Sequence, residues 1–415
     1  MLYQLREMQR SWLQPMSLSA EAVSRLYANP YNPLSFAPFA KTVSAGLELM
    51  HRLGKDYAKP GFDLTSTTIE GHEVPVVERV VLTKPFCQLR KFERVLPAAL
   101  ANRPQDPAIL LFAPLSGHYA TLLRDTVRAM LPDHDVYVTD WTDARLVPTS
   151  AGRFGFDEYV AYSIEFMRYL GPEANVVAVC QPTVPVLAAI SIMSTIGDAK
   201  VPRTMTMMGG PIDPRQSPTQ VNKLAVEKDF SWFENNLLAT VPSTYPGAGR
   251  RVYPGFLQHL AFVSMNPERH AESHWEYFLS LVKGDQGSAE SHRQFYDEYN
   301  AVLDMDADFY LETVRMVFQE HSLPRGEMKV KFEGQEYRVA PEDITGPALL
   351  TIEGEFDDIA GRGQSSAALA LCSGIPDARK REYLAEGAGH YGIFSGHRWR
   401  ETVYPQLREF IRAAK

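Results

Sequence analysis

Short apolar segments alternate with amphipathic segments between residues 108 and 208, and this alternation constrains the fold more than any other feature. The apolar segments are of strand length and lie at residues 108–113, 135–141, 175–179 and 203–208. Segments with apolar residues at helical spacing separate them, at residues 121–131, 156–170 and 184–196. Strands that are apolar along most of their length and alternate with helices are typical of a parallel sheet covered on both faces. The sequence therefore predicts an α/β protein with a mostly parallel sheet flanked by helices.

The N-terminal part of the chain has a different, helical pattern. Apolar residues recur every three or four positions from Leu2 to Leu26 and again over residues 40–53, with a break at Asn29-Pro30. We therefore expect a helical extension over residues 1–70. Two interpretations are open: the extension packs on the main domain, or its amphipathic helices touch a hydrophobic surface.

A second departure from the alternation begins after residue 211. From residue 212 to 332 the segment is helical, irregular and rich in aromatic residues, which predicts a cap over the edge of the sheet. Strand-like segments return at residues 348–354 and 380–384. The core should then consist of residues 71–211 and 333–415.

Composition limits the classes of function. The chain has 415 residues and a net charge of −8 without a basic block, which argues against a nucleic-acid binder. It has three cysteines, an odd and small number that points to a reducing compartment. No apolar run follows the N-terminal charges, and no segment is long enough to cross a bilayer. We therefore expect a cytoplasmic protein without a transmembrane segment.

Three residues with nucleophilic, acidic and basic side chains each follow the end of a predicted strand. Open parallel sheets bind their ligands at the carboxyl ends of their strands. Cys180 comes directly after the strand at 175–179 and before a helix. Asp357 follows the strand at 348–354, and His390 lies in a glycine-rich loop after the last strand. The chain order nucleophile, acid, histidine is that of the α/β-hydrolase triad. The sequence thus predicts an α/β-hydrolase fold with Cys180, Asp357 and His390 as catalytic residues.

The chemistry fits each residue type. A nucleophile on a sharp strand-to-helix turn projects above the sheet, and the helix N-terminus beside it favours a thiolate. His390 would pair with that thiolate, and Asp357 would hold the other ring nitrogen. Pro182 departs from the small residue usual two positions after the nucleophile, and Pro185 removes a backbone donor one turn into the helix.

The loop after the first parallel strand is the second part of the predicted site. The oxyanion hole should use the backbone N–H of Gln181 and that of Leu115 or Ser116. Gly117, His118 and Tyr119 follow in the same loop, and we expect them to contact the substrate.

Structural explanations compete with these assignments. A lone cysteine at a strand end is commonly a small buried hydrophobic residue, and Cys87 and Cys372 fit that description. Asp358 is an alternative acid, and either aspartate could cap a helix. No spacing typical of a metal site and no glycine-rich phosphate loop is present.

Three stretches of the sequence resemble the intracellular poly(3-hydroxybutyrate) depolymerases. They are Val179-Cys180-Gln181-Pro182-Thr183, the segment from Pro114 to Thr126, and Gly354-Glu355-Phe356-Asp357-Asp358-Ile359. The resemblance extends over nearly the whole chain. It implies that Cys180 is the nucleophile, completed by Asp357 and His390, and that Pro182 is a family trait.

The resemblance also implies a substrate and a place of action. The family acts on amorphous polymer in cytoplasmic storage granules, with no metal or organic cofactor. A thioester on the cysteine would be released by water as 3-hydroxybutyrate or a short oligomer, or by coenzyme A as a thioester. The alternatives are an acyltransferase like the polyhydroxyalkanoate synthases and a non-catalytic granule-surface protein that kept the hydrolase scaffold.

Overall fold

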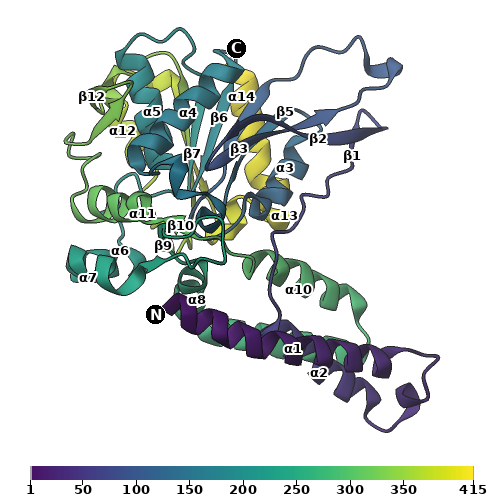
Figure 1. The fold of residues 1–415 in the computed structure, drawn as a ribbon. Helices are drawn as coiled ribbons and strands as arrows, with labels where there is room; N and C mark the ends of the chain where they lie inside the picture. Colours follow the sequence, from purple (N-terminus) through teal and green to yellow (C-terminus); the bar gives the residue numbers. More distant parts are fainter. Residues whose placement is uncertain (1, 415) are drawn as a thin grey trace.

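A computed structural model of the chain describes residues 2–414 and contains a central sheet of nine strands (Figure 1). The strand order is β1-β2-β3-β5-β4-β6-β7-β13-β14. Six neighbouring strands are parallel: β4 (Ala108–Phe112), β5 (Asp135–Trp141), β6 (Asn175–Val179), β7 (Thr204–Met208), β13 (Ala348–Gly354) and β14 (Lys380–Ala385). An antiparallel ribbon extends one edge through β1 (Ser66–Ile69), β2 (His72–Lys84) and β3 (Cys87–Arg94). The predicted mostly parallel sheet is confirmed.

Helices cover both faces of this sheet, so that every residue of β6 and β7 is buried. They are α3 (Arg124–Met130), α4 (Phe156–Leu170), α5 (Thr183–Thr195), α12 (Ala367–Leu371), α13 (Gly396–Arg398) and α14 (Tyr404–Ala413). Helix α5 is apolar on all sides and almost completely buried. Its position fixes the turn that leads into it from β6.

The segment after β7 forms the cap. It contains α6 (Gln220–Glu227), α7 (Phe230–Leu237), α8 (Gly255–Met265), α9 (Pro267–Lys283), α10 (Gln286–Tyr299) and α11 (Ala307–Thr313). A small antiparallel sheet joins them, made of β8 (Ala239–Thr240), β9 (Arg251–Tyr253) and β10 (Met305–Asp306). One turn of wider helix, η6 (Val314–Gln319), continues α11.

The expected end of the cap at residue 332 falls inside a β-hairpin. This hairpin consists of β11 (Lys329–Phe332) and β12 (Gln335–Arg338). Val330 and Phe332 are buried in the main core, and the Lys331 N–H donates to Asp157 of α4 over 3.1 Å. The hairpin therefore packs on the sheet domain, which a change of hydrophobic period could not indicate.

The N-terminal extension is a helical hairpin of α1 (Leu2–Ala28) and α2 (Ala40–Gly54), joined through the short helix η1 (Pro33–Phe36). Small side chains let the two helices approach closely. The Ser24 hydroxyl donates to the Ser44 carbonyl over 2.9 Å, and the Ser17 hydroxyl lies 3.0 Å from His51 Nδ1. No helix among residues 2–414 combines the length and apolar character needed to cross a bilayer.

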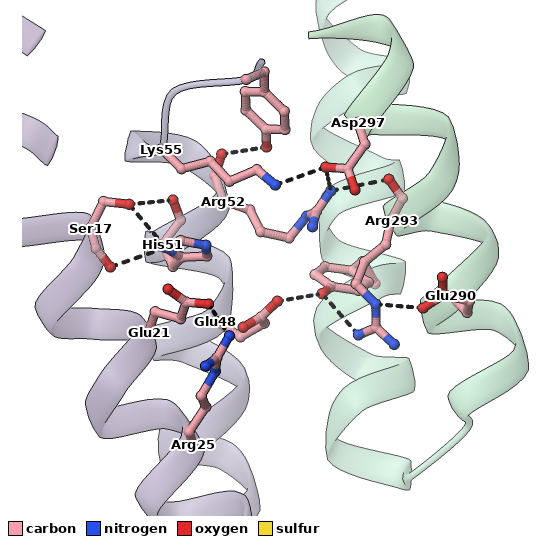
Figure 2. Close-up of polar contacts among 12 residues, drawn as sticks. Ser17, Glu21, Arg25, Glu48, His51, Arg52, Lys55, Glu290, Arg293 and Asp297 are labelled. Carbon is pink, nitrogen blue, oxygen red and sulfur yellow. Dashed lines mark hydrogen bonds and ion pairs between the residues drawn. The ribbon is translucent and has the colours of Figure 1, made fainter. Parts of the chain in front are cut away.

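Contacts of helix α2 attach this hairpin to the cap, and several of them meet at the Asp297 carboxylate (Figure 2). The Arg52 guanidinium is only 5% exposed and donates to Asp297 Oδ1 of α10 over 2.9 Å. Lys55 Nζ lies 2.8 Å from the same oxygen, and Arg52 also donates to the Arg293 carbonyl over 3.1 Å. Asp297 therefore compensates a buried positive charge that would otherwise be costly.

Replacing Asp297 with Ala should lower the free energy of unfolding by about 1–2 kcal/mol, because the buried Arg52 loses its counter-charge. Urea denaturation measures this change, and limited proteolysis should show earlier cleavage between α2 and β1. Arg25→Ala is the matched control, since Arg25 pairs with Glu21 on the exposed side of α1. That variant should stay within about 0.5 kcal/mol of the parent chain. Equal losses in both variants would contradict the role assigned to Asp297.

Candidate active site

Cys180 occupies a strained turn between β6 and α5. Its φ is +65°, a backbone conformation that is costly for a residue with a side chain. Three hydrogen bonds hold the turn. The Cys180 N–H donates to the Met208 carbonyl over 2.7 Å, and its carbonyl accepts from the Thr183 N–H over 3.1 Å and the Thr183 hydroxyl over 2.9 Å. The half-buried thiol is thus directed into the cavity beyond the ends of β6 and β7.

The two prolines near Cys180 are accommodated by the start of the helix. Helix α5 begins at Thr183, which makes Pro185 its third residue. The first four N–H groups of a helix have no partner inside it, so a proline there removes no helical hydrogen bond. The turn after the innermost parallel strands, together with this sheet order, is the arrangement of the α/β-hydrolase fold, which confirms the predicted fold class.

Two glycines after β7 make room for the turn, and sequence analysis missed their role. A Cβ atom on Gly210 would collide with the Thr183 hydroxyl and the Cys180 carbonyl. Gly209 has a φ of +56°, and a Cβ there would lie 2.6 Å from Ile393 and 3.4 Å from the His390 ring. The signal in the sequence was a glycine pair directly after a buried strand.

Asp357 and His390 form a buried pair beside Cys180. His390 Nδ1 lies 2.7 Å from Asp357 Oδ2, and neither side chain is more than 5% exposed. The other carboxylate oxygen accepts from the N–H groups of Ile359 and Ala360 over 2.9 and 2.8 Å. The alternative acid, Asp358, is exposed and accepts from Asn266 instead. Asp357 is therefore the aspartate that contacts the histidine.

The electrostatics of His390 reflect both of its neighbours. Burial by itself lowers the pKa of His390, but the charges of Asp357 and Cys180, and the hydrogen bonds that the ring donates to both, raise that pKa well above 6.5. The imidazolium form of the ring is therefore favoured beside the Asp357 carboxylate. This is the charge state that a cysteine nucleophile requires.

Of the three residues expected to form an oxyanion hole, two line the cavity and one does not. The Leu115 N–H donates to the side-chain Oε1 of Gln181 over 3.1 Å, and Leu115 is not part of the cavity wall. Ser116 and Gln181 do line the cavity. The expectation for Leu115 needs correction, because a side chain already satisfies its N–H group. The hydrogen bond from Leu115 depends on the rotamer of the Gln181 side chain, which a sequence pattern does not specify.

The expected substrate contacts of Gly117 and Tyr119 also need correction. The Gly117 carbonyl accepts from the Leu303 N–H over 2.9 Å, so Gly117 packs on the cap and lies outside the cavity wall. The Tyr119 hydroxyl points away and donates to Asp143 over 3.3 Å. Both partners are far away in the sequence, which is why local pattern could not reveal them.

His118 does line the cavity. Its Nε2 lies 3.2 Å from the Tyr299 carbonyl, and its ring packs between Phe262 and Tyr299. Burial, with a smaller effect of His259, lowers the pKa of His118 to about 4. The ring is therefore neutral at pH 7 and contributes a partly apolar surface.

The cavity has a volume of about 600 Å³ between the sheet and the cap. Cys180, Gln181 and His390 form its polar end. The cap supplies an apolar wall that includes Leu224, Phe233, Leu237, Tyr253, Phe262 and Tyr310. None of the described residues that line it is Asp, Glu, Lys or Arg. The cavity therefore suits an uncharged, largely apolar ligand.

Within residues 2–414, no cluster of three or more His, Cys, Asp or Glu side chains is arranged to hold a metal ion.

Comparisons with known proteins place this geometry in a family. Residues 209–415, which include the cap, Asp357 and His390, match the model described as "PHB de-polymerase C-terminus". No curated protein matches the chain.

Solved structures of similar shape include three proteins of low sequence identity. A putative lipase from Acinetobacter baumannii AYE is 12% identical over 82% of this chain and 93% of its own, with a TM-score of 0.40. The 2-hydroxy-6-oxo-6-phenylhexa-2,4-dienoate hydrolase from Rhodococcus sp. strain RHA1 is 13% identical over 82% of this chain and 99% of its own, with a TM-score of 0.45. A monoacylglycerol lipase from Paleococcus ferrophilus is 14% identical, over 75% and 96%, with a TM-score of 0.43. On the match to its C-terminal half, this chain belongs to the PHB depolymerase family and is an ester hydrolase.

Proposed function

We propose that this protein cleaves the ester bonds of poly(3-hydroxybutyrate) in storage granules, with Cys180 as nucleophile and His390 and Asp357 as its partners. One observation carries the proposal. A buried imidazole–carboxylate pair, 2.7 Å apart, lies at the polar end of an uncharged cavity that a cysteine on a strained turn also lines. An uncharged cavity matches an uncharged polyester, and the family match supports that substrate class.

The first half of the reaction forms a thioester. The Cys180 thiolate attacks the carbonyl carbon of an ester bond, and the electron pair moves to the carbonyl oxygen. The N–H groups of Gln181 and Ser116 are the donors we assign to that oxyanion. When the intermediate collapses, the C–O bond of the ester breaks. His390 gives its Nε2 proton to the departing alkoxide, which leaves as the hydroxyl end of the polymer.

The second half releases the acyl group. The neutral His390 takes a proton from water, and the resulting hydroxide attacks the thioester carbonyl. The C–S bond breaks, which restores the thiolate and the imidazolium and frees 3-hydroxybutyrate or a short oligomer. A thiol such as coenzyme A could replace water here and leave with the acyl group as a new thioester. Asp357 keeps the imidazole ring in place and stabilises its positive charge in both halves.

Replacing Cys180 with Ala should abolish cleavage of amorphous poly(3-hydroxybutyrate), because no other group can form the acyl-enzyme. Cys180→Ser should lose about 10²-fold or more in kcat, since the hydroxyl leaves far more proton transfer to His390. Release of 3-hydroxybutyrate from polymer particles measures both effects.

Cys372→Ala is the matched cysteine control. Cys372 is buried away from the cavity, so its loss should cost about 1 kcal/mol of stability and leave hydrolysis unchanged. Retention of full activity by Cys180→Ala would eliminate the proposed nucleophile.

Replacing Asp357 with Asn should reduce kcat/KM by about 10²–10⁴-fold. The loss of the carboxylate charge lowers the pKa of His390, because Asp357 is a main cause of its elevation. The imidazolium is then lost at a lower pH, and the thiolate has no counter-charge near neutrality. Alkylation of Cys180 by iodoacetamide at pH 6–7 should slow by about tenfold or more. Mass spectrometry of the labelled peptide gives the rate over pH 5–9, and a profile identical to that of the parent chain would contradict the proposed pair.

A further inference from the structure

Most of the large apolar side chains of helix α1 are exposed, although Tyr3 is buried. Six of the exposed residues lie on one side of the helix, whereas Leu18 is exposed on another side. We call the six the outer stripe: Leu5, Met8, Trp12, Met16, Val23 and Leu26. All are exposed, and Trp12 is 73% exposed. In a helix that advances about 100° per residue, the six lie within an arc of about 80°. The opposite side, which packs on the protein, carries the small residues Ser17, Ala20 and Ser24.

The outer stripe carries no charge. Helix α1 has five charged side chains, and all lie on the opposite or flanking sides: Arg6, Glu7, Arg10, Glu21 and Arg25. Arg10 contacts Asp56, and Arg25 pairs with Glu21. The segment from residue 11 to 20 contains no charged residue at all. A partner for this surface must therefore be apolar and uncharged.

Three aromatic residues at the tip of the hairpin are also strongly exposed. Tyr31 is 94% exposed, Phe36 is 80% exposed and Phe39 is 79% exposed. They lie in and around η1, where α1 turns back into α2. Several large exposed apolar side chains on one element mark an interaction site.

The hairpin is attached to the cap of the active-site cavity. Figure 1 shows α1 and α2 on the far side of α8 and α10 from the central sheet. Arg52 joins α2 to α10, and α8 supplies Ala261 and Phe262 to the cavity wall. A surface bound by the outer stripe would therefore lie on the cap side of the molecule.

We propose that the outer stripe and the tip residues Tyr31, Phe36 and Phe39 dock on the surface of solid, uncharged polyester. This inference rests on the proposed function, because it assigns the polymer particle as the partner of the hairpin. Docking would hold the cavity close to polymer chains without occupying the catalytic groups. An uncharged polyester matches the absence of charge on the stripe.

Two other partners fit this surface less well. An anionic bilayer is normally met by Lys and Arg beside the apolar face, and residues 11–20 offer none. A second copy of α1 in a coiled coil would need apolar residues at alternating spacings of three and four. The stripe instead has two successive spacings of four, from Met8 to Trp12 and from Trp12 to Met16, and Pro15 lies inside the helix.

The test is a triple substitution of exposed stripe residues, Met8→Gln, Trp12→Gln and Met16→Gln, in the full chain. Binding is measured by co-sedimentation with protein-free particles of amorphous poly(3-hydroxybutyrate), and hydrolysis with a soluble p-nitrophenyl butyrate. We expect the particle-bound fraction at low protein concentration to fall at least tenfold. Hydrolysis of the soluble ester should stay within twofold of the parent chain, and thermal unfolding should be unchanged.

The matched control removes three apolar side chains elsewhere: Val77→Gln, Val80→Gln and Tyr169→Gln. These residues are also exposed, although less than the three substituted stripe residues, and lie on β2 and α4, so this variant should bind particles as the parent chain does. Cys180→Ala separates the two proposals. If that variant binds particles normally but still cleaves polymer, the proposed nucleophile fails while docking stands.

Three results would overturn the docking proposal. Unchanged particle binding by the stripe variant would show that the outer stripe plays no part in docking. A parent dimer that becomes a monomer in the stripe variant, by analytical ultracentrifugation, would make the stripe an interface between copies. Binding to phosphatidylcholine–phosphatidylglycerol vesicles as tight as binding to polymer would assign the surface to membranes instead.

Discussion

The turn at Cys180 is the constraint on which the rest of the site depends. A residue with a side chain adopts a φ of +65° only when the surroundings enforce it. Here β6 and β7 are buried on both faces, α5 is almost completely buried, and the turn packs so closely on Gly210 that a Cβ atom there would collide with it. The strain is therefore stabilised by the packing of the whole sheet. A loop could not hold a thiol at this position with the same accuracy.

Charge is confined to one end of the cavity, and this division separates binding from chemistry. The apolar cap wall offers nothing to select a charged ligand. At the polar end, the backbone N–H groups of Ile359 and Ala360 hold Asp357 in a fixed orientation, and Asp357 in turn holds His390. An imidazolium on His390 is compensated by the Asp357 carboxylate 2.7 Å away, and this buried pair faces the proposed thiolate.

The sequence predicted the features that local pattern determines. Strands β4 to β7 are apolar because both faces of the sheet are covered, and Cys180, Asp357 and His390 follow strand ends. Features that depend on distant partners could not be predicted. The Tyr119 hydroxyl binds Asp143 and the Gly117 carbonyl binds the Leu303 N–H, and neither residue lines the cavity. The Leu115 N–H binds the side chain of Gln181. For α1, periodicity revealed an apolar face but not its direction, because burial depends on what packs beside the helix.

Helix α10 connects the proposed docking surface to the cavity. Near its C-terminal end, Asp297 holds the buried Arg52 of the N-terminal hairpin. Two residues later, the Tyr299 carbonyl holds His118 at the cavity wall over 3.2 Å. Because both contacts belong to the last turn of one helix, α10 links the hairpin that carries the proposed docking surface to His118 in the cavity wall.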